Sequence, residues 1–183
     1  TLDTIVWMAE FNDSKRVVEV TKSLAQYFRL ALNQGHEQIA LKDEIDHVRQ
    51  YLFIQKQRYG DKLQYAIEED ESLADYKLPK LVLQPLVENA IYHGIKEIDR
   101  QGMIRVTSAA EEGQLILSIY DNGRGFELRD STDMTLPRLG GVGLKNVDQR
   151  LRLQFGDDYH MEIQSEPDKS TQISLYLPLD SDD

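Results

Sequence analysis

The sequence contains no cysteine among its 183 residues. This absence excludes disulfides, thiolate zinc sites and a cysteine nucleophile, and it fits a reducing compartment. Cationic side chains are also scarce, because 21 Lys and Arg stand against 32 Asp and Glu and leave a net charge of −11. This negative charge argues against a protein that binds a nucleic-acid backbone. Any anionic ligand must be held by nearby side chains or backbone N–H groups that act against the overall negative field of the protein. No apolar run has the length of a membrane span, and the first residues show no basic flank before an apolar region, so we expect a soluble, intracellular piece.

The first 60 residues have apolar side chains at the three- and four-residue spacing that is typical of helices. This spacing predicts helices over residues 1–11, 15–33 and 41–59. The last of these begins with Asp43 and Glu44, which are favourable at the positive end of its dipole. An α-helical hairpin is therefore expected ahead of a third helix.

The remaining residues alternate between strands and helices. We expect a helix over 78–95, with Pro79 in its first turn and its regular part beginning near Leu83. The whole expected order is a strand at 62–67, that helix, a hairpin at 103–108 and 115–120, a glycine-rich loop at 121–142, a helix at 143–155 and strands at 159–164 and 172–177. Two hairpins argue against a Rossmann alternation and favour an α+β fold, an α/β sandwich whose mixed sheet is covered on one face by helices.

Two segments place a polar residue among apolar neighbours: one on a helix that is expected to be buried, the other directly after a strand. Asn89 lies on a helix with apolar residues around most of its circumference, so it needs a polar partner, and an amide oxygen suits Mg²⁺. Asp121 directly follows a strand and can accept a hydrogen bond from an exocyclic amine. Gly123 and Gly125 then allow the backbone to approach a flat ligand.

A third segment, Gly140–Leu151, opens a helix with several glycines, and free N–H groups at a helix start favour phosphate. Taken singly, each of the three segments is typical of ordinary turns or of a solvated helix face. Together they supply a base acceptor, a metal ligand and a phosphate cradle, which indicates a nucleotide.

These segments also resemble those of a known family. LQPLVENAIYHGI, DNGRGF and GGVGL resemble the N-box, G1 box and G2 box of the Bergerat ATP-binding fold, which histidine kinases, type II topoisomerases, Hsp90 chaperones and MutL share. LQPLVENA, with LKDEIDHVRQYLFIQKQRYGDKL at residues 41–63, is similar to the LytS/YesM-type sensor histidine kinases. The resemblance covers nearly the whole chain, and it implies a Bergerat-type sandwich that binds ATP and Mg²⁺.

The resemblance also implies roles for single residues. Asn89 matches the Mg²⁺ ligand, Asp121 the acceptor for the adenine amine, and Glu88 the acidic catalytic residue at the phosphoryl-transfer site. Residues 127–139 match the mobile ATP lid. The other implied nucleotide contacts are His93, Gly123, Gly125, Gly141, Gly143, Leu144, Lys145 and Thr171. Lys145 and Arg150 suit either the phosphates or a solvated helix face, and Ser170 stands where related domains often have glycine before Thr171.

The expected organisation has three parts: a remnant of the helical dimerisation and phosphotransfer region at 1–34, a connecting helix at 35–60 and the ATP-binding catalytic domain at 61–183. Thr1-Leu2 resembles the end of the family's acceptor segment, Asn-Pro-His-Phe-Leu-Tyr-Asn-Thr-Leu. We therefore expect the phosphoacceptor histidine just upstream and a fragment that cannot phosphorylate itself. His36, His47 and His160 lack the acceptor context, and a surface position is expected for each.

The leading hypothesis is an ATP-dependent protein-histidine kinase of a two-component system. It implies a homodimer in the full-length protein, a cognate response regulator, no nucleic acid, and a cytoplasmic location in a membrane-bound sensor. The alternative is a nucleotide-gated interaction module that binds ATP or ADP with little chemistry. A third hypothesis, an ATP hydrolase of the chaperone or topoisomerase type, has less support because those proteins use further domains.

Overall fold

A five-stranded mixed sheet forms the centre of the fold in the computed structural model, which describes residues 2–11, 13–32, 37–127 and 141–179. Its strand order is β2-β4-β5-β7-β6. The strands are β2 (Leu63–Glu68), β4 (Gly102–Glu111), β5 (Gln114–Asp121), β6 (His160–Glu166) and β7 (Ser170–Pro178). β2 and β4 are parallel and the other neighbours are antiparallel. The mixed sheet and its helices confirm the expected α+β sandwich.

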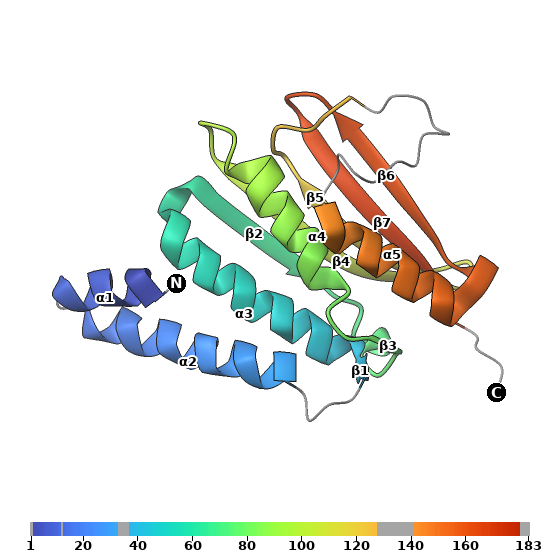
Figure 1. The fold of residues 1–183 in the computed structure, drawn as a ribbon, viewed down its shortest axis with the longest axis horizontal. Coiled ribbons are helices and arrows are strands. Elements are labelled where there is room, and N and C mark those ends of the chain that lie inside the picture. Colours follow the sequence, from blue (N-terminus) through green and yellow to red (C-terminus); the bar gives the residue numbers. More distant parts are fainter. Residues whose placement is uncertain (1, 12, 33–36, 128–140, 180–183) are drawn as a thin grey trace.

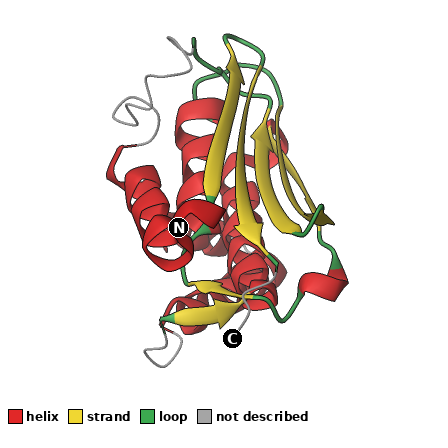
Figure 2. Cartoon of the chain, turned by 90° about the vertical axis from the view of Figure 1, so that its right-hand side faces the viewer, coloured by secondary structure: helices red, strands yellow, loops and turns green. Residues whose placement is uncertain are grey.

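Helices cover one face of this sheet (Figure 2). They are α3 (Leu41–Tyr59), α4 (Leu83–Asn89), a π-helical turn called η4 (Ala90–Ile95), and α5 (Gly141–Phe155). On β5, alternate side chains at Leu115, Leu117 and Ile119 are buried in the same core as residues of these helices. The alternation of apolar side chains that predicted the β5 strand therefore also decides which face of the sheet the helices cover.

The chain begins with α1 (Leu2–Glu10) and α2 (Ser14–Leu32), and α2 packs along α3 (Figure 1). This arrangement confirms the expected N-terminal helical hairpin. The carboxylate of Asp13 accepts a hydrogen bond from the backbone N–H of Arg16 and caps α2. α3 lies between α2 and the sheet layer, so it joins the hairpin to the rest of the molecule (Figure 1).

The expected helix over 78–95 is wrong in its first turn. Residues 77–79 form a short strand, β3 (Lys77–Pro79), that pairs with β1 (Gln38–Ala40), and Pro79 lies in this strand. The reason lies in Glu44, which is fully buried and accepts hydrogen bonds from the backbone N–H groups of Leu81 at 2.9 Å and Leu83 at 2.8 Å. This carboxylate of α3 caps α4 from another element, and so α4 begins at Leu83.

Candidate functional site

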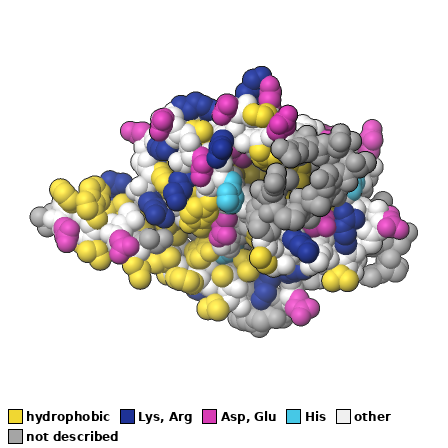
Figure 3. Space-filling model, turned by 45° about the horizontal axis from the view of Figure 1, so that its top comes forward, with side chains coloured by type: hydrophobic (Ala, Val, Ile, Leu, Met, Phe, Trp, Pro, Cys, Tyr) yellow, Lys and Arg dark blue, Asp and Glu magenta, His cyan; other side chains and the backbone are white. Residues whose placement is uncertain are grey.

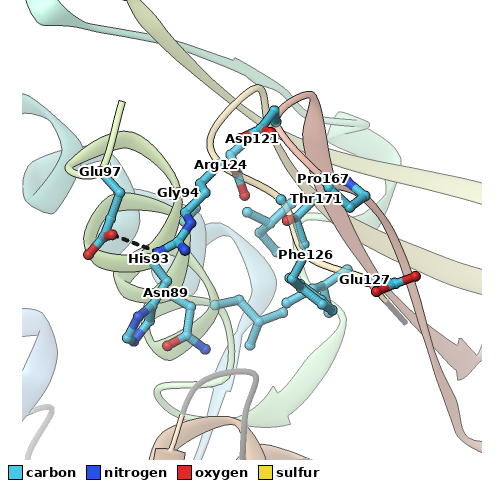
Figure 4. A pocket seen from close by; sticks show the side chains of 16 residues that line it. Asn89, His93, Gly94, Glu97, Asp121, Arg124, Phe126, Glu127, Pro167 and Thr171 are labelled. Carbon is cyan, nitrogen blue, oxygen red and sulfur yellow. Dashed lines mark hydrogen bonds and ion pairs between the residues drawn. The ribbon is translucent and has the colours of Figure 1, made fainter. Parts of the chain in front are cut away.

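A cavity of about 510 Å³ lies between the α4–η4 helix and the ends of β5 and β7 (Figure 4). Leu86, Ile119 and Ile173 give it apolar walls. Of the residues predicted from the sequence, it is lined by Asn89, His93, Asp121, Gly125 and Thr171. Residues from positions 89 to 171 therefore meet in one place, as the nucleotide hypothesis requires.

Asp121 is the last residue of β5, and its side chain is only 4% exposed. Its Oδ1 accepts a hydrogen bond from the backbone N–H of Gly123 at 2.8 Å. Burial raises the pKa of Asp121 to about 6, although that hydrogen bond and the charge of Arg100 act in the opposite direction. A buried carboxylate with so few partners is well suited to accept a hydrogen bond from a ligand amine.

Glycine at three positions allows the backbone to close around Asp121. A Cβ atom at Gly94 would overlap Asp121 Oδ1, and one at Gly123 would overlap the backbone of Gly94. Gly125 has φ +57°, and a Cβ atom there would overlap the carbonyl oxygen of Glu166. The structure thus explains the two glycines of the DNGRGF segment and adds Gly94, which the sequence analysis did not assign to the site.

Asn89 is the last residue of α4, where the helix changes from α to π geometry. Its amide Nδ2 is buried and has no hydrogen-bond partner among the described residues. Because the two ends of an amide are assigned from their surroundings, this unpartnered group can present its oxygen to the cavity. In the part of the chain that the structure describes, no group of three or more His, Asp or Glu side chains could hold a metal ion alone. Asn89 therefore fits Mg²⁺ that is shared with ligand phosphates.

Asp121 and Asn89 lie at separate ends of the cavity, and His93 lies near Asn89 (Figure 4). His93 is exposed and is one helical turn beyond Asn89. Thr171 is directly across the β5–β7 ladder from Asp121 and hydrogen bonds with Ser165 at 3.1 Å between the hydroxyl oxygens. This spacing suits a ligand with an amine at one end and an anionic group at the other.

Glu88 does not line the cavity. One residue corresponds to 100° around an α-helix, so Glu88 faces a different side from Asn89. Its Oε1 accepts a hydrogen bond from Gln84 Nε2 at 2.7 Å, and the same nitrogen donates to the Tyr27 hydroxyl of α2 at 2.6 Å. The predicted catalytic carboxylate therefore lies toward the helical hairpin.

The start of α5 lies outside the described lining of the cavity. Gly143 is near Pro85 of α4, Leu144 is fully buried, and Lys145 is exposed. Arg150 donates to the carbonyl oxygen of Lys80 at 2.8 Å, which gives it a structural contact. Gly141 begins the helix. The predicted lid at 127–139 lies outside the described residues except for Glu127, which lines the cavity.

Sequence reasoning missed an ion pair at the cavity. Arg124 Nη1 and Glu97 Oε2 are 2.9 Å apart, and both residues line the cavity with Phe126 (Figure 4). Exposed ion pairs of this kind contribute little to stability. In the sequence, the position of Arg124 between Gly123 and Gly125 is the one feature that could have indicated that Arg124 lies at the cavity.

The expected surface position of His47 is wrong. His47 is 1% exposed, and its ring stacks on that of Tyr27 with 4.4 Å between the centroids. Burial lowers the pKa of His47 to about 4, so the ring is neutral at pH 7. His47 belongs to the buried face of α3, and α2 packs against α3 and covers the His47 ring. His160 is exposed, as expected, and stacks on Tyr176, while His36 lies outside the described residues.

Comparison with known proteins matches two family models. Residues 74–181 match the model of the histidine kinase-, DNA gyrase B- and HSP90-like ATPases, and residues 1–63 match a histidine kinase model. The chain belongs to this ATPase family. The similarity to LytS/YesM-type sensor histidine kinases that the motifs indicated is confirmed.

Relatives of this chain include the sensor histidine kinase BtsS of Escherichia coli, 37% identical over 91% of this chain and 28% of its own length. The sensor histidine kinase YesM of Bacillus subtilis is 32% identical over 97% of this chain and 30% of its own length. The chain thus spans less than a third of these relatives. No helix in the described ranges is long and apolar enough to cross a membrane.

Solved structures show the same fold at lower identity. The Acinetobacter baumannii histidine kinase AdeS has a TM-score of 0.59 at 15% identity, covering 97% of this chain and 85% of its own. The histidine kinase domain of the Erythrobacter litoralis EL346 blue-light activated kinase has a TM-score of 0.57 at 17% identity, covering 89% of this chain and 74% of its own. These neighbours support the Bergerat-type sandwich.

Proposed function

We propose that this chain is the ATP-binding catalytic part of a protein-histidine kinase of a two-component system. The observation that carries the proposal is the pair of Asp121 and Asn89, which bring a buried carboxylate and an unpartnered amide into one cavity of an ATPase-family fold. Asp121 accepts a hydrogen bond from the adenine amine, and the apolar walls at Ile119 and Ile173 enclose the base. Asn89 would hold Mg²⁺ through its amide oxygen, and the metal would neutralise charge on the phosphates.

The phosphates extend from Asn89 toward the start of α5. This helix begins at Gly141, and its free N–H groups suit an anion. We assign Gly141, Gly143, Leu144 and Lys145 to the phosphate side of the bound nucleotide. In the described residues this helix start does not line the cavity, so the proposal requires it to approach when ATP binds.

Glu88 is the proposed catalytic residue on the acceptor side. Phosphoryl transfer depends mainly on position and charge, so a carboxylate beside the metal ligand can orient a histidine nucleophile. Its place between Asn89 and α2 fits this role. We place the acceptor histidine upstream of this chain in the longer protein, because Thr1-Leu2 resembles the end of the family's acceptor segment. In line with this, His93 shares one helix with Asn89, and His47 is buried.

We further propose the division into a dimerisation remnant at 1–34, a connecting helix at 35–60 and a catalytic domain at 61–183. Apolar side chains are exposed on α1, on the residue that follows it and on α2: Leu2, Val6, Trp7, Phe11, Val18, Phe28 and Leu32. Figure 3 shows hydrophobic side chains over the left-hand end of the molecule, where α1 lies, and this exposed apolar surface favours a homodimer through the hairpin. A cognate response regulator receives the phosphoryl group, and this part of a membrane-bound sensor is cytoplasmic.

Incubation with γ-labelled ATP tests the proposed activity. The longer protein, extended upstream to include the proposed acceptor, should gain a label that is lost in acid and kept in base, as phosphohistidine is. The 183-residue chain alone should bind ATP and remain unlabelled. Acid-stable label on the longer protein, or phosphohistidine on the short chain, would overturn the proposed acceptor.

The second candidate is a nucleotide-gated interaction module, which the exposed apolar face of the hairpin also favours. Such a module would bind ATP or ADP in the same cavity and change its partner contacts without transferring phosphate. Nucleotide-dependent association without any label on the longer protein would select this candidate over the kinase.

A further inference from the structure

The side chain of Gln84 joins helix α2 to the proposed catalytic carboxylate. Its Nε2 atom has two hydrogens and two acceptors in reach, the Tyr27 hydroxyl at 2.6 Å and Glu88 Oε1 at 2.7 Å. An amide nitrogen with both hydrogens used in this way has one orientation, because a flipped amide would place its oxygen against the carboxylate. Gln84 thus contacts both Tyr27 and Glu88 through the same nitrogen.

Tyr27 is itself held in place by α3. Its ring stacks on His47 with an interplanar angle of 16°, and His47 is buried on the side of α3 that meets α2. Both ring nitrogens of His47 lack hydrogen-bond partners among the described residues, so its contact with Tyr27 is made by the ring face. The position of the Tyr27 hydroxyl therefore depends on how α2 packs against α3.

The opposite end of α4 is fixed independently. Glu44 of α3 is fully buried and accepts hydrogen bonds from the backbone of Leu81 and Leu83, directly before Gln84. Backbone hydrogen bonds to a buried carboxylate anchor the start of α4 on α3. The side-chain contact from α2 is a single hydrogen bond on a half-buried tyrosine. A shift of α2 along α3 would break this contact and leave the hydrogen bonds from Glu44 to the start of α4 in place.

We propose that Tyr27 is a positioning residue for Glu88 and acts through Gln84, so that α2 controls the rate of phosphoryl transfer without touching the nucleotide. This inference rests on the proposed kinase function. It adds a regulatory connection from the helical hairpin to the acceptor side of the site. When α2 is in the position seen here, Glu88 is oriented for transfer; when α2 moves away, Gln84 releases Glu88.

Rates of histidine labelling in the longer protein test this connection. Tyr27→Phe removes only the hydroxyl, and Gln84→Met removes the amide at similar length. Losing one hydrogen bond that orients a charged group should lower the labelling rate roughly three- to tenfold. ATP affinity should stay the same, because neither side chain lines the cavity. Tyr65→Phe is the matched control, since it removes the hydroxyl of another half-buried tyrosine, on β2, and its rate should match the unsubstituted protein.

The double variant separates positioning from a general loss of packing. If Tyr27 acts only through Gln84, Tyr27→Phe with Gln84→Met should be no slower than Gln84→Met alone, whereas independent effects would multiply. Unchanged or faster labelling by Tyr27→Phe, or multiplied effects in the double variant, would overturn the proposal. An unlabelled unsubstituted protein would instead refute the kinase function, so the two failures are distinguishable.

Discussion

Asp121 and Thr171 are direct partners across the β5–β7 ladder, and both line the cavity that η4 closes. Their pairing brings an acidic residue at the end of one strand beside a hydroxyl at the start of another, 50 positions later in the chain. The backbone at Gly94 and Gly123 also lies directly against the Asp121 side chain, so the site needs these glycines as well as the strand pair. The sheet register therefore determines the site as much as the motifs do.

Asp121→Asn should weaken ATP binding tenfold or more. The amide keeps the shape of the side chain but loses a charge-assisted hydrogen bond to adenine, which is worth about 1.5–3 kcal/mol, and about 1.4 kcal/mol is a factor of ten. Titration calorimetry measures the affinity. Asp148→Asn is the matched control, because Asp148 is also a buried carboxylate but contacts Arg152 and Tyr159 instead of the cavity. Equal losses in both variants would point to a general effect on the fold.

ATP affinity should fall as the pH drops through about 6, the pKa to which burial raises Asp121. Only the ionised carboxylate accepts the amine fully, so affinity should decrease about tenfold for each pH unit below that value. Asp121→Asn supplies the baseline, since it still reports the titration of the nucleotide itself. Parallel pH profiles for the two proteins would show that Asp121 does not contact the base.

The same pKa shift predicts an effect on stability. A carboxyl with a folded-state pKa of about 6 against an ordinary value of 3.8 favours its protonated form. Its contribution to stability is fully present below pH 3.8 and is lost as the pH rises through 6. At pH 7 the unliganded Asp121→Asn protein should therefore melt at the same temperature or higher, even though it binds ATP poorly. A large decrease in melting temperature, measured by calorimetry, would contradict this account.

Asn89→Ala should remove the Mg²⁺ dependence of nucleotide binding and leave the melting temperature nearly unchanged. The unpartnered amide contributes little to the fold, whereas its oxygen is the proposed protein ligand of the metal. The affinity is compared with Mg²⁺ and with a chelator. Asn146→Ala, on the exposed face of α5, should retain full Mg²⁺ dependence. An equal loss of affinity with and without Mg²⁺ would assign Asn89 to structure.

Gly94→Ala should weaken both ATP binding and the fold, because the new methyl group would overlap Asp121 Oδ1. Gly113→Ala is a control with a different outcome. Gly113 has φ +80° and open space around it, so alanine there strains a hairpin turn far from the cavity. It should cost about 1 kcal/mol of stability and leave ATP affinity intact. Normal ATP affinity in Gly94→Ala would show that Asp121 can move without consequence.

Much of this molecule could be predicted from local sequence patterns. The alternation of β5 and the stripe of α3 each reflect a constraint that acts within a few residues. Glu44 shows where this reasoning stops, since an acid in the first turn of α3 was expected at that helix's own dipole but caps α4 instead. His47 is similar, because its burial depends on α2, which lies elsewhere in the sequence.

For the site, the sequence could predict individual residues but not the contacts between them. Asn89, Asp121 and Thr171 were found from their motifs, and the structure brings all three to one cavity. The Glu97–Arg124 ion pair and the close approach of Gly94 to Asp121 depend on how the π-helical turn passes the end of β5. No local periodicity encodes that contact, since it is a packing contact between elements about 25 residues apart in the chain.

A crystal structure of the chain with a non-hydrolysable ATP analogue and Mg²⁺ tests the central claim most directly. The account predicts the adenine amine within hydrogen-bond distance of Asp121, the base between Ile119 and Ile173, and the metal ion on the amide oxygen of Asn89. It also predicts the start of α5 close to the phosphates. A nucleotide bound elsewhere, or bound in this cavity with its phosphates beside Asp121, would contradict the account.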